Sequence, residues 1–251
     1  MLSQFSFFLV QVKLFDSVEG VSGSWLVEKI IGVIGGIGPD ATHDFFGKIL
    51  AATPVGKEQD HIQLIIHNNT KVPDRNQSIA GTGISCAPAL VSIAQNLERA
   101  GAEVLVMPCN TAHAYADDIT AAVSIPLLNI VAETCRSLKA LDRSITKVGV
   151  LASNGCRQAM LYDAELEQHG IECINLTEND QCLCMETIYN VKRQVDLVSA
   201  QESMESLAQS LFDRGAQVII SGCTEIPLVL EAENKPYILL DSTQVLVERC
   251  I

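Results

Sequence analysis

The amino-acid sequence repeats itself once along its length. Residues 31–38 (IGVIGGIG) resemble residues 148–155 (VGVLASNG), which lie 117 positions later. Residues 99–109 (RAGAEVLVMPC) resemble residues 213–223 (DRGAQVIISGC), which lie 114 positions later. A change in loop length between the two pairs accounts for the different offsets. The repeat therefore predicts that the chain folds as two homologous halves.

Strand-like and helix-like segments alternate in each half. The apolar run at 30–34 ends in glycines, as a buried strand does when it enters a tight turn, and residues 40–52 have the apolar spacing of a helix. Residues 148–151 and 158–169 repeat this order. Such alternation is typical of parallel sheets covered by helices on both faces. We therefore predict two homologous α/β domains with parallel sheets, related by a pseudo two-fold axis, with the active site in the cleft between them.

The chain is expected to cross between these domains twice. The predicted first domain comprises residues 29–128 and 226–251, and the predicted second domain comprises residues 129–225. Residues 1–28 are interpreted as an N-terminal extension. No basic region precedes their apolar stretch, no small-residue cleavage site follows it, and it is too short to span a bilayer.

Composition limits the classes of function. The 251 residues carry a formal net charge of −13, which disfavours binding to nucleic acids or to anionic membrane surfaces. The nine cysteines form no C-x-x-C pair, so neither a disulfide framework nor a structural zinc site is expected, and a reducing cytoplasm fits best. An anionic ligand would therefore need a local site built from a few cations and backbone N–H groups.

Two of the cysteines occupy equivalent positions in the repeat. Cys109 and Cys223 each follow a predicted strand, and ligands of open α/β sheets bind at the carboxyl ends of strands. Inverting a stereocentre by proton transfer needs a base on one face and an acid on the other, and two thiols, one ionised and one neutral, can fill both roles. We interpret the other seven cysteines as small buried hydrophobic residues. A redox pair is less favoured, because a C-x-x-C arrangement is missing.

Four motifs resemble the aspartate racemase branch of the aspartate/glutamate racemase family. They are residues 35–39 (GGIGP), residues 68–69 (NN) followed by 73–75 (PDR), residues 107–113 (MPCNTAH) and residues 221–227 (SGCTEIP). They occur in the family's order, and the similarity extends over residues 29–242. The resemblance implies a cofactor-independent racemase that uses neither pyridoxal phosphate nor a metal. It also implies a small acidic amino acid as substrate, aspartate ahead of glutamate, and a homodimer.

The resemblance assigns roles to individual residues. Cys109 and Cys223 would be the catalytic acid and base. The other candidates would bind the substrate: Asn68, Arg75, Asn110, Thr111, Asn154, Lys192, Arg193 and Thr224. Arg75 suits a carboxylate, because a planar guanidinium can bind both of its oxygens.

Three positions depart from the family pattern. Cys156 stands where the family usually has a threonine in its second glycine-rich turn. The family places a lysine four residues after a tyrosine, whereas Tyr189 is followed by Lys192 at three and Arg193 at four, so either cation could bind the side-chain carboxylate. Glu225 stands where the glutamate racemases of cell-wall synthesis usually have a histidine, which favours the aspartate or a broad-specificity branch.

Other functions remain open at this stage. A cysteine-nucleophile isomerase or hydrolase acting on a small dicarboxylate would use Cys109 with Cys223 assisting, and His113 would then be a candidate base, although we prefer a structural role for it. A non-catalytic protein would bind an amino acid without turnover. A nucleotide-dependent oxidoreductase is disfavoured, because residues 67–69 (HNN) replace the acidic ribose ligand. Glu225 either orients the second thiol or begins a helix.

Overall fold

The computed structural model describes residues 29–232 and 235–251, so the predicted N-terminal extension lies outside the described residues. Within them the chain forms two four-stranded, fully parallel sheets. The first sheet has the order β2-β1-β3-β4, with β1 (Ile31–Gly35), β2 (Leu64–Asn68), β3 (Val104–Val106) and β4 (Leu127–Leu128). The second has the equivalent order β6-β5-β7-β8, with β5 (Lys147–Leu151), β6 (Glu172–Ile174), β7 (Val218–Ser221) and β8 (Ile238–Asp241). The equal orders confirm the predicted homologous halves.

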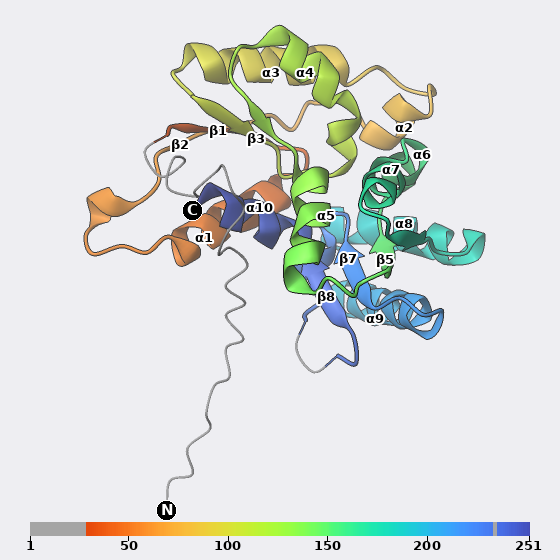
Figure 1. The fold of residues 1–251 in the computed structure, drawn as a ribbon. Helices are drawn as coiled ribbons and strands as arrows, with labels where there is room; N and C mark the ends of the chain where they lie inside the picture. Colours follow the sequence, from red (N-terminus) through yellow and green to blue (C-terminus); the bar gives the residue numbers. More distant parts are fainter. Residues whose placement is uncertain (1–28, 233–234) are drawn as a thin grey trace, which may run out of the picture.

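Helices connect the strands and cover the sheets (Figure 1). The α-helices are α1 (Pro39–Ala52), α2 (Arg75–Ile79), α3 (Ala87–Arg99), α4 (Ala116–Ala122), α5 (Ile130–Leu141), α6 (Asn154–Gln158), α7 (Leu161–Gln168), α8 (Glu178–Lys192), α9 (Leu197–Asp213) and α10 (Ser242–Cys250). Short 3₁₀ helices are η2 (Glu58–Asp60), η3 (Thr111–Tyr115) and η4 (Ile226–Leu228). Side-chain caps fix several helix starts: the Asn129 side chain accepts from two N–H groups of α5, and Asp241 caps α10. No helix of the described residues is both long and apolar enough to cross a membrane.

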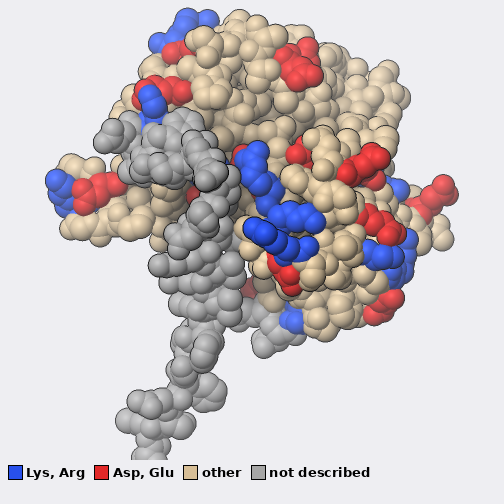
Figure 2. Space-filling model, viewed as in Figure 1, with Lys and Arg blue, Asp and Glu red and all other residues tan. Residues whose placement is uncertain are grey.

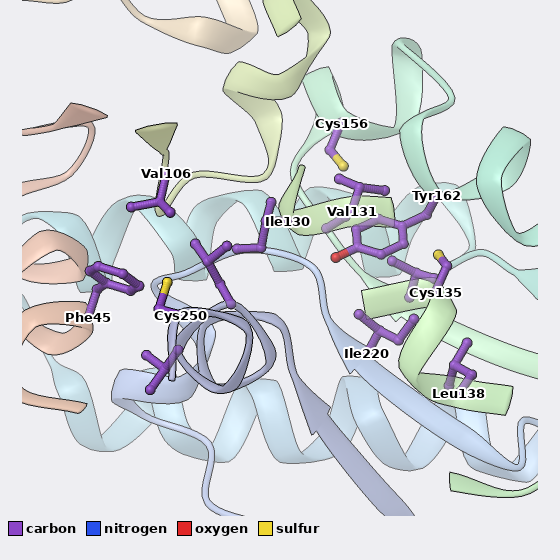
Figure 3. Packing of buried hydrophobic residues seen from close by; sticks show 14 of the residues in the cluster. Phe45, Val106, Ile130, Val131, Cys135, Leu138, Cys156, Tyr162, Ile220 and Cys250 are labelled. Carbon is purple, nitrogen blue, oxygen red and sulfur yellow. The ribbon is translucent and has the colours of Figure 1, made fainter. Parts of the chain in front are cut away.

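The two sheets share one hydrophobic core. Alternate residues of β3 and β7 point to opposite faces, so Val106 and Ile220 enter a common cluster while their neighbours Leu105 and Ile219 enter separate clusters on the outer faces. Figure 3 shows the common cluster, with side chains of α5 between the two sheets. Because the halves share this core, their relative position is fixed by packing.

The last helix of each half packs on the other half. α5 follows β4 and packs against α7, whereas α10 follows β8 and packs against α1, and the two helices contact each other (Figure 1). The expected return of the chain to the first domain after about residue 226 therefore needs correction. β8, at residues 238–241, still pairs with β7 in the second sheet, and only α10 crosses back. The physical reason is that β8 completes the second sheet next to β7 in the same way as β4 completes the first sheet next to β3.

Candidate active site

The two repeat-matched cysteines lie at equivalent edges of the two sheets. Cys109 follows the end of β3 by three residues, and Cys223 follows the end of β7 by two. Both side chains are nearly buried, with exposed fractions of 7% and 6%. The carboxyl ends of parallel strands are where open α/β sheets bind their ligands. The repeat has thus placed one thiol at the ligand-binding edge of each sheet.

The thiol of Cys223 faces a carboxylate. Its Sγ donates to Oε2 of Glu225 at 3.0 Å, and the other oxygen of Glu225 pairs with the ammonium of Lys192. Burial and then the negative charge of Glu225 raise the pKa of Cys223 well above its ordinary value, although Lys192 opposes the rise. Cys223 is therefore a neutral thiol in this arrangement.

Cys109 lies in a more cationic setting. Burial lowers the pKa of Arg75, but negative charge at Cys109 and Asp74 more than offsets this, so the pKa of Arg75 is raised. The guanidinium donates to the Pro73 carbonyl at 3.1 Å. Arg75 is therefore a neighbouring cation for Cys109, whereas the thiol of Cys223 meets an anion.

Lys192 connects the surroundings of the two thiols. Burial lowers its pKa, but the negative charge of Glu225 and then that of Cys223 and Cys109 act in the opposite direction, and the net pKa is raised. Lys192 therefore lies within electrostatic range of both sulfurs. It is the last residue of α8, so the end of this helix carries the ammonium into the site.

A cavity of about 200 Å³ opens beside these groups. Its lining includes the first glycine-rich turn at Gly36 and Gly38, together with Arg75, Lys192 and Glu225. The two buried thiols do not line it, but Glu225, which accepts from the thiol of Cys223, does. Its small volume and charged lining suit a compact polar ligand.

The glycines of the first turn are required by close approach. Gly36 has φ of 87°, and a Cβ there would lie 2.4 Å from the backbone nitrogen of Asn69. A Cβ on Gly38 would lie 3.1 Å from Oε1 of Glu225. The turn therefore comes close to the ion pair at the cavity only because these residues lack side chains.

A second, larger cavity of about 530 Å³ lies along α1. Its lining combines apolar and small residues, among them Gly47, Val191 and Leu228, with polar and charged residues of α1 such as Asp44 and Lys48. Arg75, Glu225 and the thiols do not contribute to its walls. We assign the chemistry to the smaller cavity, because the charged groups that act on the two thiols, Arg75, Lys192 and Glu225, line it.

Asn110, which follows the first cysteine, belongs to a chain of hydrogen bonds between the halves. Tyr162 of α7 donates from its hydroxyl to Oδ1 of Asn110 at 2.7 Å. Nδ2 of Asn110 donates to Oγ of Ser242 at 3.0 Å, and Oγ of Ser242 donates to the Ser221 carbonyl at 2.8 Å. The side chain of Asn110 thus links the segment after Cys109 to the strand before Cys223.

The two predicted threonines also bridge the halves. Oγ1 of Thr111 lies 2.7 Å from Oγ of Ser153, the capping residue of α6, and Oγ1 of Thr224 donates to the Pro108 carbonyl at 3.3 Å. Both threonines are buried. Their hydroxyl groups therefore bond to protein groups of the opposite half, and the backbone N–H groups of these segments are the donors that they leave for a substrate.

Three further predicted residues do not line the smaller cavity. Asn68 is exposed at the end of β2, and Oδ1 of Asn154 accepts from the Gln181 side chain at 2.9 Å. Arg193 is exposed and bonds to its own helix, at the carbonyl of Tyr189 and at the Asn190 side chain. Of the two cations after Tyr189, Lys192 is the one that the fold brings to the cavity.

The polar contacts that place Arg75 are partly local and partly long-range. Asp74 caps α2 by accepting from the N–H of Gln77 at 3.0 Å, as its position three residues before a glutamine suggests. Its second oxygen accepts from the hydroxyl of Tyr189 at 3.2 Å. Asn76 accepts from the N–H of Gly155 at 2.8 Å. These long-range bonds hold α2 against the second half and have no local sequence signal.

His113 has the structural role that we preferred for it. Its Nδ1 lies 2.9 Å from the Cys109 carbonyl, and its Nε2 accepts from the N–H of Ile130 at 3.3 Å. Burial lowers the pKa of His113 to about 4. The neutral tautomer with a proton on Nδ1 satisfies both contacts, so the ring ties the backbone of Cys109 to the start of α5.

Comparison with known proteins finds relatives that match most of the chain. The family model for Asp/Glu/Hydantoin racemase matches residues 34–250. The broad specificity amino-acid racemase RacX from Bacillus subtilis strain 168 is 26% identical over 226 residues, which are 88% of this chain and 96% of that protein.

Solved structures share the two-half architecture. The aspartate racemase of Picrophilus torridus matches with a TM-score of 0.80 and 27% identity, over 89% of this chain and 93% of that one. Glutamate racemase isoform RacE1 from Bacillus anthracis shares the fold, with a TM-score of 0.66 at 18% identity over 88% of this chain and 80% of that one. Since the family model spans most of its length, the chain belongs to the Asp/Glu/Hydantoin racemase family.

Proposed function

We propose that this protein racemises a small amino acid, aspartate first and glutamate second, by cofactor-independent proton transfer at Cα between Cys109 and Cys223. Amino-acid racemisation, an isomerisation, is the activity that the names of its relatives carry. The observation that most supports the two-thiol mechanism is the placement of the cysteines. They occupy equivalent strand ends, and the charge of each acts on Lys192 at one small cavity.

The unlike surroundings suggest how the cycle begins. Cys109, near Arg75, starts as the thiolate and removes the Cα proton. Cys223, whose S–H donates to Glu225, starts as the thiol and gives its proton to the opposite face of Cα. One proton is taken and one is given, so the cycle ends with the two charge states exchanged. The reverse reaction starts from that exchanged state.

Two cations would hold an acidic amino acid. Arg75 is suited to the α-carboxylate, because a guanidinium can bind both oxygens and so favour negative charge that develops beside Cα. Lys192 is suited to the side-chain carboxylate. The free thiols of the described residues fit a reducing cytoplasm, and we expect a homodimer, which light scattering would test.

The test is inversion with solvent exchange. The reduced protein is incubated in D₂O with L-aspartate or L-glutamate and without added cofactor, while chiral chromatography follows the enantiomers and NMR follows the Cα proton. We expect the D-enantiomer to form with deuterium at Cα. Absence of both inversion and exchange would overturn the proposal and favour binding without turnover or a nucleophilic cysteine.

Single substitutions test the two thiols separately. Cys109→Ser and Cys223→Ser should each abolish formation of the opposite enantiomer, because each direction needs both an acid and a base. Cys182→Ser is the matched control, since Cys182 is an exposed thiol on α8. Near-normal turnover in both directions by either active-site variant would refute the two-thiol mechanism.

A further inference from the structure

The cation suited to the substrate's side chain already has a partner within the protein. Oε1 of Glu225 pairs with Nζ of Lys192, and the exposed fractions of the two side chains are only 5% and 22%. Both groups line the smaller cavity. A side-chain carboxylate that approached Lys192 would therefore meet an ammonium whose charge is already balanced, with the carboxylate of Glu225 beside it.

Arg75 provides the contrast. It is partly buried in the same cavity, yet within the described part of the chain it forms no ion pair, and its recorded hydrogen bond goes to the Pro73 carbonyl. Its guanidinium can therefore receive a carboxylate without displacing a protein anion. Since every α-amino acid has an α-carboxylate, Arg75 does not distinguish acidic substrates from neutral ones, and Lys192 is left as the group that could.

We propose that Glu225 determines specificity by occupying Lys192, so that the site selects only weakly for a second carboxylate and also accepts amino acids with a neutral amide side chain. This inference rests on the proposed racemase function and deepens it. An acidic side chain can bind Lys192 only by sharing it with Glu225 or displacing Glu225, which would leave a buried carboxylate without its cation. An amide side chain brings no charge, and its N–H₂ group can donate to Glu225.

Glu225 also bonds to the thiol of Cys223, so a change there will alter turnover of every substrate. The ratio of kcat/KM for two substrates removes this common effect, because the same thiol acts on both. L-aspartate and L-asparagine form a suitable pair, since they have nearly the same shape and differ in side-chain charge. L-glutamate and L-glutamine give a second pair that is one methylene longer.

The experiment measures kcat/KM for these four amino acids in the wild type and in Glu225→Gln. The amide keeps the shape and can accept from the thiol but leaves Lys192 unpaired. In the wild type we expect kcat/KM for aspartate to exceed that for asparagine by no more than about tenfold. Glu225→Gln should raise this ratio at least about tenfold, because the substrate carboxylate then has the charge-assisted contact to Lys192 to itself. Glu133→Gln, which alters another buried ion pair on α5, should leave the ratio unchanged.

The outcomes separate this inference from the function on which it rests. If the wild type inverts none of the four, the proposed function fails and the inference fails with it. If the wild type is active but strongly prefers aspartate, or if Glu225→Gln leaves the ratio unchanged, only the role of Glu225 is refuted. Should Glu225→Gln fold but turn over neither substrate, equilibrium binding of aspartate and asparagine to both proteins measures the same ratio.

Discussion

Tyr162 offers a direct test of how the two thiols are held in place. Its hydroxyl begins the chain of hydrogen bonds that passes through Asn110 and Ser242 to the carbonyl of Ser221. Asn110, the second member of this chain, directly follows Cys109, and Ser221, its last member, lies two residues before Cys223. The substitution Tyr162→Phe removes only the donor hydroxyl and keeps the ring in the shared core.

The expected cost follows from burial. Asn110 is 1% exposed, so water cannot replace the lost donor at its Oδ1, and an unsatisfied buried acceptor costs about 1–3 kcal/mol. For a chain of this length, 1 kcal/mol shifts the midpoint of thermal unfolding by roughly 2–4 °C, so the midpoint should fall by about 2–12 °C. The variant stays folded at 25 °C, because folded proteins commonly retain about 5–15 kcal/mol of stability.

Activity should fall by more than the loss of stability explains. A displacement of about 1 Å in a catalytic group can cost roughly a hundredfold in rate, and loss of this bond loosens the segment after Cys109. We expect kcat for racemisation to fall at least about tenfold at a temperature where circular dichroism shows a folded protein. Tyr237→Phe is the matched control, since Tyr237 is also buried but packs against Phe212, outside this chain of bonds. If Tyr162→Phe behaves like the control in both assays, the hydrogen-bond chain does not position the thiols.

Two further predictions concern residues around the site. Lys192→Met should lower kcat/KM for L-aspartate at least about tenfold, because it leaves the buried carboxylate of Glu225 without its cation, next to the thiol of Cys223 and to the anionic substrate. Arg193→Met, on the exposed end of α8, should change kcat/KM by less than about twofold, and equal effects of the two variants would contradict this assignment. Acidification should destabilise the fold through His113, because burial lowers the pKa of its ring to about 4. Below about pH 6.5 His113 binds a proton in the unfolded chain but not in the folded one. The free energy of unfolding therefore falls by up to about 3 kcal/mol as the pH drops from about 6.5 to 4. Urea unfolding across this range should give a shallower pH dependence for His113→Gln, and identical slopes would show that His113 is not the group responsible.

The repeat made most of the fold predictable. A pattern of glycines and strand-like runs that occurs twice implies two equivalent sheets, and the observed strand orders match. The predicted domain bounds placed α5 with the second half and α10 with the first, and these helices pack there. A local apolar pattern shows that an element has a buried face but does not identify the surface that covers it. The same limit explains why β8 was assigned to the wrong half.

The site was predictable where the repeat or a local rule pointed to it. Cys109 and Cys223 were found as a matched pair, and the cap formed by Asp74 follows from its spacing to a glutamine. The choice between Lys192 and Arg193 depended on the residue at which α8 ends, and helix ends are poorly defined by sequence. The bonds of Asn110 join residues 52 and 132 positions away, and nothing local distinguishes a substrate-binding asparagine from one that bonds across halves.

The differences between the halves explain the chemistry better than the repeat does. The offset of 114 positions that relates the two cysteines also places Glu225 opposite Thr111. Thr111 forms a hydrogen bond with Ser153. Glu225 instead accepts a hydrogen bond from the thiol of Cys223 and forms an ion pair with Lys192. Duplication alone would give two thiols with equal affinity for a proton, and a resting enzyme with both neutral would lack a base. Under the proposed mechanism, the unlike neighbours, Arg75 near Cys109 and Glu225 at Cys223, would let a symmetric scaffold hold one acid and one base at the start of a cycle.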